Sequence, residues 1–139
     1  ILYGIAKGLS RSNVVLWAKD ALGKGSSINV VDDQWRMPTL AEDLADGCIR
    51  IAKQGASGTY HLSGPDGMSI LELVLRVADF FNLSTANVNA IKSDALEQPA
   101  KRPPVTGFIL DKARRELGYD PRGLEAGLAV LRDQLPSPR

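Results

Sequence analysis

The sequence contains few of the residues that form cross-links or metal sites. One cysteine (Cys48) and one histidine (His61) occur among its 139 residues, so no internal disulfide can form and a reducing, cytoplasmic compartment is expected. No cluster of side chains has the spacing of metal ligands. No apolar run approaches the roughly 20 residues of a membrane span and no signal peptide opens the chain, so we expect no membrane partner.

An excess of basic residues is also missing. The formal net charge is only +1, which provides no field for nucleic acid. A composition of 44% hydrophobic and 24% charged residues is typical of a folded globular domain. The chain opens abruptly on "ILYGIAKG" without an initiator methionine. We therefore expect residues 1–139 to be a single partial domain of a longer protein.

The first half of the chain predicts helix, strand and helix. Apolar spacing indicates a helix over residues 11–22, and a β-branched run indicates a strand at 27–32. Thr39, with Glu42 three positions later, predicts a capping box at the start of the next helix. The predicted buried stripe of that helix comprises Leu40, Leu44, Cys48, Ile51 and Ala52.

The second half continues the alternation. A strand is expected at 58–64, where His61 is interpreted as a core residue without chemistry. Ser69 and Glu72 predict a second capping box. The helix that follows is expected to bury Ile70, Leu73, Val74, Val77 and Phe81.

The last third is expected to be irregular over residues 82–104. Two short helices follow at 111–117 and 124–135, separated by a glycine C-cap within "GYDP". The order of elements indicates a mixed α/β fold. Because two short strands make a poor sheet, we expect them to extend a sheet supplied by residues upstream of Ile1.

Several segments in a fixed order carry a family resemblance. "VVDDQWRMPTLAEDLADG", "GTYHLSG", "SILELV", "KRP" and "LDKARRELGYDP" together resemble the C-terminal half of extended short-chain dehydrogenases/reductases, most closely the dTDP-4-dehydrorhamnose reductase (RmlD-like) group. The resemblance runs from about residue 1 to 131. It implies an α/β substrate-binding lobe plus the last strand or strands of a Rossmann-type sheet, with the N-terminal cofactor half missing.

The resemblance also implies candidate substrate contacts. The reductase pattern DQ-x-G-x-PT is matched by Asp33, Gln34, Pro38 and Thr39, but Arg36 stands where the reductases usually carry glycine. Related nucleotide-sugar epimerases have an arginine in this frame that contacts the nucleotide, and a planar fork of donors suits a diphosphate or a base edge. The alternative is a solvated Arg36 or a salt bridge to Asp32.

The remaining candidates have similar alternatives. Arg102 matches an arginine of the family that commonly reaches substrate phosphates, or it is an ordinary surface residue. Asp33 and Gln34 either bind a sugar hydroxyl or brace the loop, and Thr39 can cap its helix while the helix N-terminus presents amides to an anion. Trp35 either stacks on a base or, the simpler interpretation, covers the core.

The chain is expected to hold neither the cofactor nor the catalytic residues. No G-x-G-x-x-G or related fingerprint is present. Tyr3 and Lys7 have the Y-x-x-x-K spacing of the catalytic pair, but Gly4 and Gly8 disfavour the long helix that this pair needs, each by about 1 kcal/mol. We interpret the match as chance and "ILYG" as the end of a later strand, so that NAD(P)(H) and catalysis depend on residues outside this chain.

Three functions are compatible with these observations. The favoured hypothesis is the substrate-binding portion of an NAD(P)-dependent reductase of nucleotide-linked 4-keto sugars, with an epimerase or dehydratase as its variant. The second is a non-catalytic nucleotide-binding regulatory subunit. The third is a free-standing interaction module. A homodimer formed through the open edge of the sheet is also possible.

Overall fold

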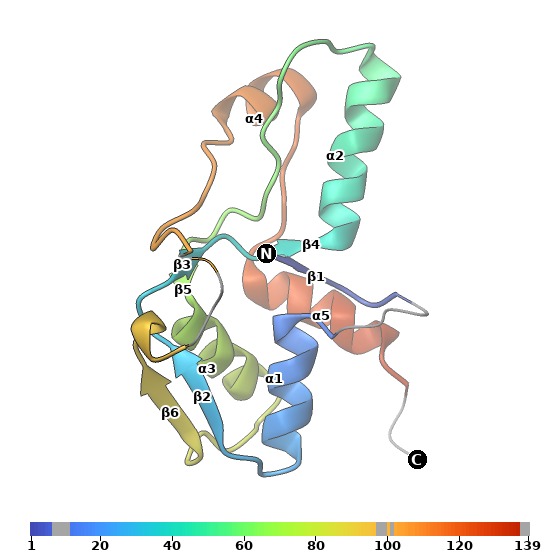
Figure 1. Cartoon of the computed structure of the whole chain (residues 1–139). Coiled ribbons are helices and arrows are strands. Elements are labelled where there is room, and N and C mark those ends of the chain that lie inside the picture. Colours follow the sequence, from blue (N-terminus) through green and yellow to red (C-terminus); the bar gives the residue numbers. More distant parts are fainter. Residues whose placement is uncertain (7–11, 97–99, 101, 137–139) are drawn as a thin grey trace. The chain divides into compact units, whose positions relative to one another are not determined.

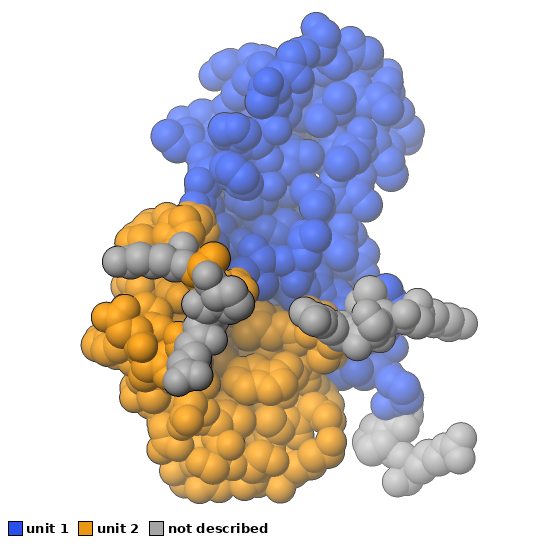
Figure 2. Space-filling view, in the orientation of Figure 1, with its two compact units in different colours: residues 1–7, 37–66, 107–139 blue, residues 8–36, 67–106 orange. Residues whose placement is uncertain are grey.

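The computed structural model describes residues 1–6, 12–96, 100 and 102–136. Figure 1 shows the helices and strands of the chain, which divides into two compact units (Figure 2). Unit 1 comprises residues 1–7, 37–66 and 107–139, and unit 2 comprises residues 8–36 and 67–106. Each unit is assembled from segments that are distant in the sequence, so no single point in the chain separates them.

Unit 2 combines two helices with short strands. Helix α1 spans Val14–Gly23 and packs against α3, Ile70–Phe80, which in turn packs on β2, Ile28–Val31. Strand β2 pairs in parallel with β6, Val88–Ile91, from Ile28↔Val88 to Val31↔Ile91. The buried side chains of these elements are aliphatic: Val15, Ala18, Leu22, Ile28, Val30, Val31, Leu73, Val74, Val77 and Ala78.

A second pair of strands in unit 2 carries the candidate site. Strand β3, Trp35–Arg36, pairs antiparallel with β5, Met68–Ser69. Ser69 then caps α3, since its hydroxyl accepts a hydrogen bond from the Glu72 amide at 3.0 Å. The predicted helix start at Ser69 is therefore confirmed.

Strand β6 is the main element that the sequence prediction missed in unit 2. Residues 82–104 were expected to be irregular, but they also contain the 3-10 helix η1, Ser93–Ala95. "VNAI" is short and flanked by polar residues, so its own sequence is a weak strand signal. Its strand conformation depends on β2, which lies about 60 positions earlier in the sequence.

The described residues of unit 1 form a parallel strand pair and three helices. Strand β1, Leu2–Tyr3, pairs with β4, Thr39–Leu40, and helix α2 follows at Ala41–Gln54. Helices α4, Asp111–Leu117, and α5, Leu124–Gln134, complete the unit. The parallel pairing of β1 confirms the interpretation of "ILYG" as the end of a strand, while Lys7 lies outside the described residues.

A small apolar core stabilises part of unit 1. Leu110, Ala113, Leu117 and Tyr119 are buried together, with four partly buried side chains packed against them: Ile51, Ala56, Tyr60 and Leu62. Gly118 ends α4 in a left-handed conformation with φ of 62°, as the predicted glycine C-cap requires.

The prediction of a capping box at Thr39 is wrong. Helix α2 begins only at Ala41, its N-cap is Leu40, and no side chain caps it. The Thr39 amide donates instead to the Ile1 carbonyl (2.8 Å), as the pairing of β4 with β1 demands. The tertiary strand pair therefore overrides the local helix-start signal.

The predicted buried stripe of α2 is also largely wrong. Leu40 is buried, but Cys48 and Ala52 are exposed and Leu44 and Ile51 are half-buried. The face that packs inward presents Asp43 and Gly47 instead. Apolar spacing alone could not reveal this, because an acidic residue occupies the buried face.

The strand predicted at 58–64 does not form. Polar groups of this segment make individual hydrogen bonds instead of a strand pairing. The Gly64 amide donates to Thr39 Oγ1 (2.9 Å), and the Ser63 carbonyl accepts from Tyr119 Oη (3.1 Å). His61 is exposed rather than buried and stacks on Phe108, with ring centroids 4.7 Å apart.

Among the described residues, no helix is both long and apolar enough to cross a bilayer.

Candidate functional site

Arg36 is the central residue of the candidate site in unit 2. It lies on β3 and is only 9% exposed. One terminal nitrogen, Nη1, donates to the carbonyls of Trp35 (2.6 Å) and Pro104 (3.2 Å), and Nη2 donates to Gln34 Oε1 (3.1 Å). All three acceptors are neutral. In the described part of the chain no carboxylate pairs with this guanidinium, so the described residues provide no counter-charge for it.

The two aspartates that precede Arg36 have other partners. Asp32 pairs with Lys92 at 2.8 Å, which rules out the predicted alternative of an Asp32–Arg36 bridge. Asp33 accepts hydrogen bonds from the Ser93 amide (3.0 Å) and hydroxyl (2.8 Å). The bond from the Ser93 amide is the main cause that lowers the pKa of the Asp33 carboxyl. Asp33 therefore braces the start of η1 in this structure.

Arg102 belongs to a segment that lies against β3. We call residues 102–106 the Arg102 arm. The Trp35 amide donates to the Pro104 carbonyl (2.7 Å), and the Thr106 amide donates to the Trp35 carbonyl (3.0 Å). Arg102 itself is exposed. The structure thus brings Arg36, Gln34 and the Arg102 arm together, although Arg36 and Pro104, for example, are 68 positions apart in the sequence.

Trp35 does not cover the core. Its side chain is 44% exposed, whereas that of Arg36 is buried. Successive residues of a strand point to opposite faces, so the indole and the guanidinium of β3 do not share one face. The expectation of a core tryptophan is wrong.

Thr39 is placed in unit 1 and is 4% exposed. Its hydroxyl donates to the Met37 carbonyl (3.1 Å) and accepts from the Gly64 amide (2.9 Å). This arrangement ties the "PT" motif to the "LSG" segment. Both hydrogen-bonding directions of the hydroxyl are already used inside the protein.

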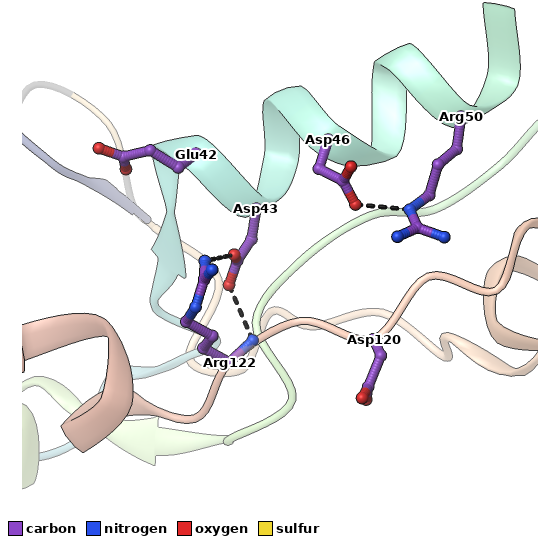
Figure 3. A pocket seen from close by; sticks show the side chains of 6 residues that line it. All are labelled: Glu42, Asp43, Asp46, Arg50, Asp120 and Arg122. Carbon is purple, nitrogen blue, oxygen red and sulfur yellow. Dashed lines mark hydrogen bonds and ion pairs between the residues drawn. The ribbon is translucent and has the colours of Figure 1, made fainter. Parts of the chain in front are cut away.

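Unit 1 also contains an open depression of about 380 Å³ that the sequence reasoning did not identify (Figure 3). Its arginines are paired with its own carboxylates: Arg122 with Asp43, and Arg50 Nε with Asp46 at 2.5 Å. The Arg122 amide also donates to Asp43 (2.8 Å). The remaining lining residues are Glu42 and Asp120. The contacts of Arg122 with Asp43 fasten the loop between α4 and α5 to α2, whereas the Arg50–Asp46 pair lies within α2. No metal-binding group of three or more ligand side chains occurs among the described residues.

The model of one known protein family matches almost the whole chain. The family model described as "RmlD substrate binding domain" matches residues 2–136. A methionine adenosyltransferase 2 subunit beta from Pongo abelii is 32% identical over 108 residues, which cover 74% of this chain and 32% of that protein. A dTDP-4-keto-6-deoxy-D-glucose reductase from Streptomyces niveus is 30% identical over 95 residues, covering 68% of this chain and 33% of that protein.

Solved structures show the same fold. A dTDP-4-dehydrorhamnose reductase from Bacillus anthracis, solved in complex with NADP, superposes with a TM-score of 0.83 at 24% identity and covers 96% of this chain. A dTDP-glucose 4,6-dehydratase from the same species superposes with a TM-score of 0.75 at 12% identity.

The chain accounts for only part of each of these proteins. It spans about a third of the length of the curated relatives and under half of the solved chains. The expected fold is confirmed: the chain has the α/β fold of part of these Rossmann-type proteins. The chain belongs to the RmlD substrate binding domain family.

Proposed function

We propose that this chain is the substrate-binding portion of an NAD(P)-dependent reductase of nucleotide-linked 4-keto sugars. The observation that carries the proposal is the buried Arg36 guanidinium, which has three neutral acceptors and no carboxylate partner among the described residues. A buried charge is costly unless it is paired. A nucleoside diphosphate would supply negative charge on pairs of oxygens that the planar guanidinium can bind with two parallel hydrogen bonds.

The free donors of Arg36 suit this role. Its hydrogen bonds to the described residues use both hydrogens of Nη1 and one of Nη2, so Nε–H and one Nη2–H remain for a phosphate. The hydrogen bond from Nη2 to Gln34 Oε1 fixes the orientation of the guanidinium plane. The exposed Arg102 supplies a second cation from the Arg102 arm.

The other predicted contacts have supporting roles in this proposal. Asp33 and Thr39 already hold hydrogen bonds to Ser93 and Gly64, and they keep the adjacent loops in place. NAD(P)H, when bound, supplies the hydride. Since the sequence lacks a dinucleotide fingerprint, other residues of the protein would hold that cofactor. The contribution of this chain is to orient the sugar, which can lower a barrier by several kcal/mol.

Steady-state kinetics of the intact protein with a dTDP-linked 4-keto sugar and NADPH test the proposal. We expect Arg36→Ala to raise KM about 10- to 100-fold with a smaller effect on kcat, because charged hydrogen bonds present before the chemical step are lost. Arg115→Ala, at an exposed position in α4, is the matched control. An unchanged KM in Arg36→Ala would remove Arg36 from the site.

A regulatory subunit is the second candidate. It is favoured by the 32% identity to a methionine adenosyltransferase subunit beta over 74% of this chain. The gene upstream of the Ile1 codon separates the two candidates: a glycine-rich βαβ start followed by a helical Y-x-x-x-K supports an enzyme. A fingerprint without that pair, together with dTDP-sugar-independent binding to a partner enzyme, supports regulation.

The amount of cofactor consumed per sugar distinguishes an epimerase from a reductase. A reductase consumes one NADPH for each sugar reduced, whereas an epimerase changes the sugar without net cofactor consumption. Arg36, which departs from the reductase pattern, makes this measurement necessary. A cytoplasmic location and a homodimer remain predictions.

A further inference from the structure

The Arg102 arm has an unusual dependence on β3. Proline has no backbone N–H, so neither Pro103 nor Pro104 can donate a hydrogen bond that would hold the arm in place. The anchoring point nearest to Arg102 is the Pro104 carbonyl, an acceptor. It receives one hydrogen bond from the Trp35 amide (2.7 Å) and one from Arg36 Nη1 (3.2 Å).

The prolines also make the arm stiff. Each proline ring fixes φ near −65°, and the residue before a proline is confined to extended conformations. Both restrictions act between Arg102 and Pro104. The placement of the Pro104 carbonyl is therefore transmitted to the backbone of Arg102 with little freedom in between.

Arg36 is suited to hold this carbonyl. A single nitrogen, Nη1, bridges the Trp35 and Pro104 carbonyls, while Nη2 is held by Gln34 Oε1. A guanidinium can serve these acceptors at once because its donors are fixed in one plane. A lysine keeps the charge but has no such fork.

From these contacts we propose that Arg36 is the positioning residue for Arg102, in addition to any contact of its own with the ligand. The inference rests on the proposed function, since it takes Arg102 to bind the anionic part of the substrate. On this view, the contribution of Arg102 to substrate binding depends on the planar fork of the Arg36 guanidinium. Loss of the fork releases the arm even when the positive charge is retained.

A double-mutant cycle on the intact protein tests this dependence, with dTDP as the titrated probe. We expect Arg102→Ala to weaken dTDP binding about 10-fold in the wild-type background. In the Arg36→Lys background we expect the same change to cost less than about 2-fold, because the arm is no longer held in place. Arg115→Lys is the control background, in which Arg102→Ala keeps its full effect. Additive losses in the Arg36→Lys cycle would overturn the proposal.

A measurement without ligand separates this inference from the proposed function. Hydrogen exchange of the Trp35 and Thr106 amides, which join β3 to the arm, is expected to accelerate in Arg36→Lys and to stay unchanged in Arg102→Ala. Unchanged exchange in Arg36→Lys contradicts the positioning role. If wild-type protein fails to bind dTDP, the proposed function fails, and the exchange rates still decide whether Arg36 holds the arm.

A second variant leaves Arg36 intact and loosens only the link. Pro103 is exposed, so Pro103→Gly should fold normally. We expect it to weaken dTDP binding in the wild-type background and to have no effect in Arg102→Ala, while the Trp35 amide stays protected. Equal losses in both backgrounds would show that the stiff link does not act through Arg102.

Discussion

Both units bury apolar side chains, but they differ in the part that buried polar groups play. In unit 2 the helices and β2 bury aliphatic side chains against one another, and the polar residues Gln34 and Arg36 are confined to β3 and its neighbours. In unit 1, the buried polar residues Asp43 and Thr39 also join loops to α2 and β4 through side-chain hydrogen bonds. An apolar core is visible in the periodicity of a sequence, whereas a hydrogen bond between a side chain and a distant amide is not. This difference explains why the predictions for the two units fared differently.

The largest expected effect tests the aliphatic core of unit 2. Leu73 on α3 is 0% exposed, and Leu73→Ala should lower the free energy of unfolding by about 3 kcal/mol, because it leaves a cavity that the neighbours fill only in part. Leu75→Ala, on the exposed side of the same helix, is the control and should cost well under half as much. Hydrogen exchange should accelerate first in unit 2, and equal acceleration in unit 1 would erase the contrast between the units.

A close backbone approach in unit 1 gives the next largest effect. A Cβ at Gly64 would lie 1.9 Å from the Pro38 carbonyl oxygen, and a backbone atom cannot move aside cheaply. We expect Gly64→Ala to destabilise the protein by about 2 to 3 kcal/mol in denaturant unfolding. Gly67→Ala is the control, since nothing lies within 4 Å of its added Cβ. Similar midpoints for both variants would contradict this account of the "LSG" segment.

A smaller effect is expected at the hydroxyl that joins "PT" to "LSG". Thr39→Val keeps the shape of the side chain but leaves the buried Gly64 amide without its acceptor, which should cost about 1 to 2 kcal/mol. Thr59→Val, at an exposed position in the same unit, serves as the control. Thermal unfolding of the two variants measures the difference, and a loss no larger than that of Thr59→Val would make the Thr39 hydrogen bond unimportant.

The smallest effect concerns Tyr119 at high pH. Burial raises the pKa of its phenol from 10.0 to about 12, and its hydroxyl donates to the Ser63 carbonyl. The folded state favours the neutral phenol, so this stabilisation is complete below the ordinary pKa of tyrosine and is lost as pH rises through about 12. Tyrosinate absorbance followed against pH, in wild type and in Tyr119→Phe, isolates the group. Ionisation of Tyr119 near its ordinary pKa would show that it is not buried in solution.

The outcome at the candidate site follows the same division. The family resemblance predicted Arg36 and Arg102 as substrate contacts, and Gln34 as either a contact for a sugar hydroxyl or a brace of its loop. Sequence reasoning could not foresee that the Pro104 carbonyl accepts from both Trp35 and Arg36, because these residues lie far apart in the chain. It also assigned Trp35 to the core, since a large aromatic residue usually lies there, whereas the alternation of β3 exposes the indole once Arg36 is buried.

The sequence by itself determined the elements whose signals are local. The helix cap at Ser69, the glycine that ends α4 and the aliphatic face of α3 follow from residues within a few positions of one another. The order of such elements along the chain indicates the α/β class. The tertiary structure alone decided that Thr39 belongs to a strand, that residues 58–64 do not, that β6 forms, and that Arg36 lies beside the Arg102 arm. The physical reason is the same in each case: the deciding hydrogen bonds join groups that only folding brings together, and they outweigh the weak preferences of the local sequence.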